Sequence, residues 1–165
     1  MQLNKQFGFA LTEALVALLV LSLGAIGLLW MHQQALVLQR QQHMRAIAMV
    51  TAQDLAERMR LNAPQAAIYT KAWGASTSSA AFNCASNACS RQNLAQWDMQ
   101  AVQQNLQQQM PEGDFAVFPL VGVAQWWGIL IAWHDGQETY RTDTQSGSPD
   151  CPADMSCWRL FFRPD

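Results

Sequence analysis

A long apolar run near the start of the chain limits what this sequence can fold into. From residue 9 to residue 31, the only polar side chains are those of Thr12, Glu13 and Ser22. A helix over this run is about 34 Å long, which is enough to cross a hydrocarbon core of about 30 Å. A cleavable secretory signal would have a shorter apolar region, of about 7–15 residues, followed by small residues at its cleavage site. We therefore expect residues 9–31 to be retained as a single membrane anchor.

The flanks of the run predict its orientation. Lys5 is the only full charge before it, so the positive-inside tendency places residues 1–8 in the cytoplasm. All four cysteines lie beyond residue 83, in the part that would be exported to a compartment where disulfides persist. The expected protein crosses the membrane once and has an exported body.

Glu13 is the unusual residue of this segment. A charged side chain at the centre of a bilayer costs about 2.5–3.5 kcal/mol on insertion scales. One interpretation is that Glu13 lies shallow, about 6 Å along the helix from Phe9, and reaches the water of the headgroup region. The other is that its carboxylate has a specific partner.

The sequence GFALTE at residues 8–13 favours a partner, because it resembles the processing signature of type IV pilins. That signature is a short basic leader ending in Gly, then Phe, with Glu four residues after the Phe and an apolar helix behind it. The resemblance implies that a prepilin peptidase cuts between Gly8 and Phe9 and methylates the new amine of Phe9. Ala10 and Thr12 depart from the commonest pattern, in which Thr or Ser and then Ile or Val occupy these positions.

The resemblance also gives Glu13 a role. Its carboxylate would pair with the terminal amine of Phe9 in a neighbouring subunit, and leaving either charge unpaired in a low-dielectric medium is costly. The implied partners are the prepilin peptidase, other minor pilins and the major pilin. The implied location is the inner membrane, with the head in the periplasm, followed by the pilus at the cell surface.

The helix is expected to continue beyond the membrane. Residues 33–61 contain neither Pro nor Gly and are rich in good helix formers. An apolar stripe recurs there at steps of three and four residues: Met44, Ala48, Ala52, Leu55 and Met59. Asn62-Ala63-Pro64 ends the helix. The predicted organisation is a leader (1–8), a transmembrane half of the helix (9–31), an exported half (32–62) and a globular head (63–165).

The sequence of the head predicts a loop, a helix and a small sheet. Residues 65–90 are small and polar, and Ser90 is a plausible N-cap for a helix over 91–110. We expect the apolar side of this helix to carry Leu94, Trp97, Ala101, Leu106 and Met110. Strands are predicted at 115–121, 126–134, 138–142 and 157–163. Pro119 indicates an edge strand, and Asp135-Gly136 predicts a hairpin turn before the third strand.

This order predicts an α+β fold, the pilin fold, in which the long N-terminal helix packs on an antiparallel sheet of three to four strands. Trp127, Ile129, Ile131 and Trp133 alternate onto one face, which can bury against the apolar stripe. The cysteines, Trp97 and the tryptophan-flanked strand ending at Trp133 also resemble a minor-pilin group, the type IV pilus modification proteins called PilV.

The four cysteines form two close pairs in sequence, and four thiols allow three connectivities. Closure within each pair demands least from the rest of the fold, so Cys84–Cys89 and Cys151–Cys157 are the preferred disulfides. A zinc site is the alternative, but its cysteines are usually two to four residues apart, and an exported domain is the wrong compartment for thiols.

No enzymatic chemistry is expected, and no cofactor or metal. His134-Asp135-Gly136 reads as a turn, since no nucleophile accompanies it. Asp150, Asp154 and Ser156 offer too few oxygens for the six or more that calcium usually takes. The net charge of −2 and the mixing of Arg58 and Arg60 with acidic residues argue against nucleic-acid binding.

The sequence is compatible with three functions. The first is a minor pilin that joins other minor pilins to prime pilus assembly. The second is a pseudopilin of type II secretion, which is built on the same principles. The third is a membrane-tethered enzyme or binding domain in which Glu13 is incidental.

Overall fold

The computed structural model describes residues 7–77, 83–136, 140–142 and 148–164, without the side chains of residues 7–10. Its elements are helix α1 (Phe7–Leu61), the 3-10 helix η1 (Ala63–Tyr69), helix α2 (Arg91–Gln109) and strands β1 (Asp114–Pro119), β2 (Trp127–Trp133) and β3 (Ser156–Phe162). The chain divides into two compact units, Met1–Gln42 and His43–Asp165.

The first unit consists of the N-terminal part of α1. The helix is continuous from Phe7, as the absence of proline and the density of Leu and Ala predict. Gly24 and Gly27 lie inside it, and a Cβ added at either position would meet no atom within 4 Å. Close packing within this chain therefore does not explain why glycine occupies these two positions.

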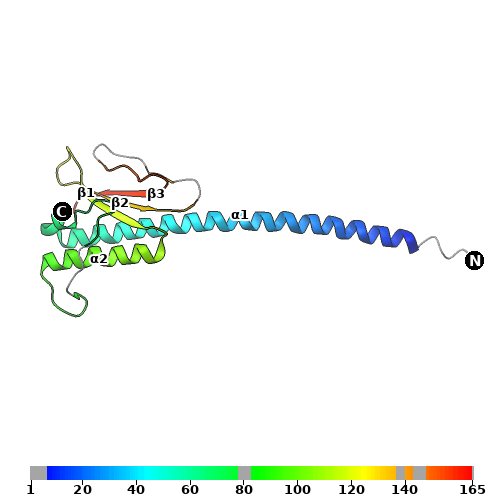
Figure 1. Ribbon diagram of the computed structural model, residues 1–165, viewed down its shortest axis with the longest axis horizontal. Coiled ribbons are helices and arrows are strands. Elements are labelled where there is room, and N and C mark those ends of the chain that lie inside the picture. Colours follow the sequence, from blue (N-terminus) through cyan, green and yellow to red (C-terminus); the bar gives the residue numbers. More distant parts are fainter. Residues whose placement is uncertain (1–6, 78–82, 137–139, 143–147, 165) are drawn as a thin grey trace, which may run out of the picture. The chain divides into compact units, whose positions relative to one another are not determined.

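The second unit has one main core, which joins α1, η1, α2 and one face of the sheet (Figure 1). The predicted stripe of α1 is confirmed, since all five of its residues are buried in this core. The sheet contributes alternating residues of β2 and β3 that lie on one face: Ile129, Ile131, Trp133 and Phe162, with Trp127, Trp158 and Leu160 at the margin.

The sheet has the strand order β1-β2-β3, with both pairs antiparallel. β1 is an edge strand, as Pro119 indicates, and Lys71 extends its outer edge through an isolated bridge to Val117. The opposite face carries a smaller cluster of Ala116, Leu130, Ala132 and Cys157. Position 128, on this face, requires glycine because the ring of Phe118 lies across it. A Cβ at Gly128 would be 2.4 Å from that ring.

Two predicted features differ from the structure near the helices. The sequence predicts a loop over 65–90, but η1 occupies Ala63–Tyr69 and buries Tyr69. In α2, the cap is as predicted, with the Ser90 hydroxyl accepting a hydrogen bond from the Asn93 N–H. Its buried face is Ala95, Asp98, Met99, Val102 and Leu106, whereas Leu94 is 36% exposed. The buried face of α2 differs from the predicted one because Asp98, a polar residue, is buried together with its hydrogen-bond partners.

The predicted hairpin after β2 is wrong for the described residues. Both edges of β2 are already occupied, by β1 and by β3, so no third strand can pair with it. Instead, Arg141 forms a parallel bridge with Cys157 at the start of β3. Residues 138 and 139 of the predicted strand lie outside the described residues.

Candidate assembly interface

The surface of α1 in the first unit is apolar, and the described residues leave it uncovered. Every large apolar residue from Leu11 to Leu38 is exposed, from 43% at Val37 to 71% at Leu21. Over this segment the helix is long and apolar enough to cross a membrane, with a mean hydropathy of 2.5 in its most apolar window. The hydroxyl of Ser22 donates to the carbonyl of Leu19 at 2.8 Å, so this polar group is satisfied within the helix. A surface of this kind requires lipid or other apolar helices around it.

Glu13 interrupts this surface. It is exposed, and it is the only acidic residue of the sequence before Asp54. The next cation after it in the sequence is Arg40, about 40 Å further along a helix by its rise per residue. Within the span, no cation of the same helix is therefore near enough to neutralise the carboxylate.

Gly8 and Phe9 lie in the first turn of α1, which begins at Phe7. Phe9 and Glu13 are four residues apart, so their Cα atoms lie on the same side of the helix, about 6 Å apart along its axis. Cleavage between Gly8 and Phe9 and methylation of Phe9 stay predictions.

A buried polar network fixes the end of α1 against η1 and α2. Arg58 donates to Asp98 at 2.7 Å and to Asp54 at 2.8 Å. The hydroxyl of Tyr69 donates to the other oxygen of Asp98 at 2.8 Å, and the amide of Asn62 donates to the carbonyl of Arg91 at 2.8 Å. α1 and η1 are thereby joined to the distant helix α2, and the two bonds to Asp98 are charge-assisted.

The network changes the acidity of two of its members. Burial raises the pKa of the Tyr69 hydroxyl; the hydrogen bond from Asn62 lowers it, and the contact with Asp98 raises it further. Burial acts to lower the pKa of Arg58, but the hydrogen bonds to Asp98 and Asp54 outweigh burial and raise it. Tyr69 is therefore neutral and Arg58 charged in the folded head at neutral pH.

A second buried ion pair fixes the segment that follows η1. The Lys71 ammonium donates to Asp114 at 2.6 Å and to the carbonyl of Phe115 at 2.8 Å. The second carboxylate oxygen of Asp114 accepts from the backbone N–H of Gly74 at 2.9 Å. Residues 71–74 are thus held against the start of β1.

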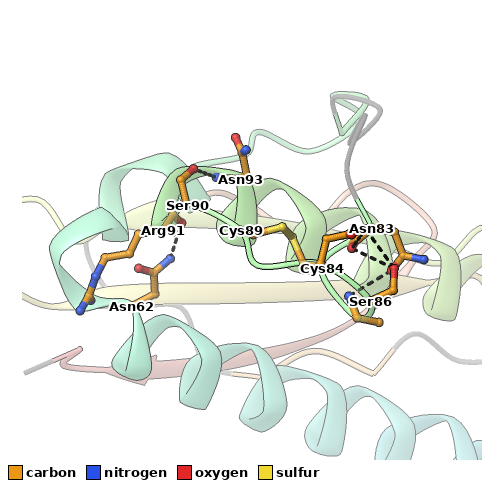
Figure 2. Close-up of a disulfide and its surroundings, with 10 residues drawn as sticks. Asn62, Asn83, Cys84, Ser86, Cys89, Ser90, Arg91 and Asn93 are labelled. Carbon is orange, nitrogen blue, oxygen red and sulfur yellow. Dashed lines mark hydrogen bonds between the residues drawn. A yellow bond between two sulfur atoms is a disulfide. The ribbon is translucent and has the colours of Figure 1, made fainter.

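Both cysteine pairs are joined as local disulfides, with Cα–Cα distances of 5.5 Å for Cys84–Cys89 and 6.1 Å for Cys151–Cys157. Figure 2 shows the first bond directly before the Ser90 cap of α2. The second joins the segment before β3 to that strand, over the smaller apolar cluster of the sheet.

The polar residues after β2 have structural contacts. The carboxylate of Asp135 accepts from the Ser156 hydroxyl at 2.7 Å, and that hydroxyl accepts from the Tyr140 N–H at 2.8 Å. The exposed His134 is tied by its backbone N–H to the carbonyl of Pro111 at 3.0 Å. Among the described residues, no three His, Cys, Asp or Glu side chains converge as a metal site would require.

The sequence interpretation missed the buried charges. Asp98 and Lys71 are 4% and 6% exposed, and each is satisfied by a partner at least 40 residues away in the chain. The one local signal was Asp98 itself, which lies between Trp97 and Met99 on a helix that otherwise carries few charges.

Comparison with known proteins adds one match. Residues 32–100 match the Tt1218-like family model, described as type IV pilin Tt1218. The matched region covers the C-terminal part of α1, η1 and the first half of α2, and it supports a relationship to type IV pilins. It begins after the GFALTE signature, so the two lines of evidence concern different parts of the chain. No curated protein and no solved structure matches the chain.

Proposed function

We propose that this chain is a minor pilin, a structural subunit that joins other pilins in a type IV pilus. The observation that carries the proposal is Glu13, a lone carboxylate on an apolar helix surface that the rest of the described chain leaves exposed. The family match over residues 32–100 supports a pilin role independently of this residue.

Processing would create the partner that Glu13 lacks. Cleavage after Gly8 by a prepilin peptidase frees the amine of Phe9, which is then methylated and remains a cation. In a medium of low dielectric constant, an amine of one subunit and a carboxylate of the next attract strongly, and each is costly alone. Because this attraction is strongest in one alignment of the two helices, Glu13 would set the axial position of each subunit in the assembly.

The remaining parts of the chain fit this role. Residues 9–31 would hold the subunit in the inner membrane, and the disulfide-bonded head would fold in the periplasm before the subunit enters the pilus. The buried charges of the head have structural partners, and in this proposal they hold α1, η1 and α2 together rather than catalyse a reaction.

A pseudopilin of type II secretion is the second candidate, because it would use the same helix and the same carboxylate. Deletion of the coding gene in a producing cell separates the two. Loss of twitching with normal protein secretion supports the minor pilin, whereas loss of secretion with normal twitching supports the pseudopilin.

The test of the assembly role is Glu13→Gln, with Ser22→Ala as a matched control. Both change a polar side chain of the same helix: Glu13→Gln removes a negative charge, whereas Ser22→Ala removes a hydroxyl that is already bonded to its own backbone. We expect Glu13→Gln to insert in the membrane and to be processed, as judged by intact mass corresponding to residues 9–165 plus one methyl group. Its co-purification with other pilins and its amount in sheared pili should fall, whereas Ser22→Ala should behave as the wild type.

Two results would contradict the proposal. Normal assembly of a correctly processed Glu13→Gln subunit would show that the carboxylate is an incidental, shallow residue. A wild-type protein that keeps residues 1–8 in membranes containing the peptidase would show that the chain is a plain membrane-tethered protein.

A further inference from the structure

A polar hollow of about 550 Å³ lies in the second unit, between α2, the segment 74–77 and the start of β1. Its volume is within the range of about 300–1,000 Å³ that is usual for small-molecule sites. None of its described lining residues belongs to α1, so its function does not depend on the proposed role of Glu13 in assembly.

The side chains around the hollow are uncharged amides and hydroxyls for the most part. Gln100, Gln103, Gln104 and Gln107 recur at steps of three and four residues, which places them on one side of α2. Ser76 and Thr77 line the other side. Among the described lining residues there is no aromatic or large aliphatic side chain and no Lys or Arg. This composition disfavours apolar ligands and anions.

Buried contacts hold the walls of the hollow in place. Asp114 lines it and is bound at both oxygens, by Lys71 at 2.6 Å and by the Gly74 N–H at 2.9 Å. Gly113, another lining residue, approaches α2 so closely that a Cβ there would lie 2.9 Å from the carbonyl of Leu106. The site is therefore largely formed before any ligand binds, which lowers the entropy cost of binding.

One lining group is left unsatisfied. The side-chain carbonyl oxygen of Gln103 is buried and has no hydrogen-bond partner among the described residues. A buried acceptor without a partner is unfavourable, and this one belongs to a side chain that lines the hollow. A ligand that carries hydroxyl donors would satisfy this oxygen.

We propose that the hollow binds a neutral saccharide. Each glutamine amide offers a donor and an acceptor side by side, and each sugar hydroxyl both donates and accepts, so neighbouring hydroxyls match a row of amides. Glu112 adds a carboxylate that accepts from a hydroxyl. Because the charge of Asp114 is paired with Lys71, the carboxylate of Glu112 is the lining group that would repel acidic sugars.

The test uses the full chain in phospholipid nanodiscs, because sugar-based detergents would compete for the site. The probes are glucose, galactose, mannose and N-acetylglucosamine, with glucuronic acid as the anionic comparison, and binding is followed by saturation-transfer NMR. We expect at least one neutral sugar to bind and glucuronic acid to bind more weakly than glucose.

Variants locate the binding. Gln103→Leu and Gln107→Leu should each weaken the sugar about three- to tenfold, the loss expected for one hydrogen bond. Gln92→Leu is the matched control, since Gln92 is an exposed residue of the same helix outside the hollow. Equal thermal unfolding of the three variants excludes a general loss of folding; Gln107 is exposed, so its replacement should leave the core intact.

The proposal would be overturned if none of the four neutral sugars binds. It would equally be overturned if Gln107→Leu binds the sugar as well as Gln92→Leu does, because the binding would then lie elsewhere on the molecule.

Discussion

The Lys71–Asp114 pair allows the sharpest test of how the head is held together. Its side chains are 4% and 13% exposed, and the carboxylate bonds both the ammonium and the Gly74 N–H. Asp114→Asn preserves the shape and leaves the amide oxygen free to accept from Gly74. It removes the negative charge and the oxygen that accepts from Lys71, so the buried ammonium faces an NH2 group in place of its counter-ion.

The expected loss follows from this geometry. Removing one partner of a buried ion pair costs about 3–5 kcal/mol. Lys71 retains the Phe115 carbonyl at 2.8 Å and the face of the Phe115 ring at 4.7 Å, which favours the lower end of that range, about 3 kcal/mol. Since about 2–8 °C of Tm corresponds to 1 kcal/mol in domains of this size, the head should melt at least about 6 °C lower.

Tryptophan fluorescence of the full chain in micelles measures the effect, because six of the seven tryptophans lie in the head. Asp54→Asn is the control: it removes a carboxylate that is 51% exposed from its pair with Arg58, and should cost less than about 1 kcal/mol. Adding Lys71→Met to Asp114→Asn should cost less than the sum of the two single changes. A loss below about 1 kcal/mol for Asp114→Asn, or additive single effects, would refute the reasoning.

Three further predictions concern the head. Gly113→Ala should destabilise it by several kcal/mol in urea unfolding, because its Cβ would lie 2.9 Å from the backbone carbonyl of Leu106; a neutral effect would show that the turn can shift. The raised pKa of Tyr69 means that the unfolded state loses this proton first, so the free energy of unfolding should fall as the pH rises above 10.0, and Tyr69→Phe should reduce this fall; an unchanged pH profile would contradict it. Replacing both Cys84 and Cys89 with serine should cost about 2 kcal/mol, the entropy of a loop this short, and a calorimetric Tm that does not move would show that the bond adds no stability.

The features that could be predicted from the sequence are those in which a helix or strand buries one of its faces. The stripe of α1 and the alternation in β2 are periodic, so each could be identified without knowledge of its partner. Pro119 at the edge of the sheet and Ser90 at the start of α2 carry local signals of the same kind.

Features that depend on distant partners could not be predicted. Nothing near Lys71 in the sequence indicates that Asp114 will neutralise it. Asp135-Gly136 carried a correct local signal, since Gly136 has a φ of 67°, but a turn signal does not say which strands will already lie beside β2. In the candidate interface, Glu13 was identified because the proposed partner also has a sequence signature, the Phe that follows Gly8.

The short span of both disulfides has a consequence for the order in which the head matures. Their cysteines are separated by 5 and 6 residues, and loops of about this length close within about 10–100 ns, long before thiol oxidation can occur. Pairing Cys89 with Cys151 instead would require closing a loop about ten times longer, at an extra cost of about 2 kcal/mol in the unfolded chain. An oxidant can therefore make both correct bonds while β1, β2 and β3 are still unpaired. Formation of the correct bonds therefore does not depend on prior sheet formation, and mispaired intermediates that an isomerase would have to repair are scarce.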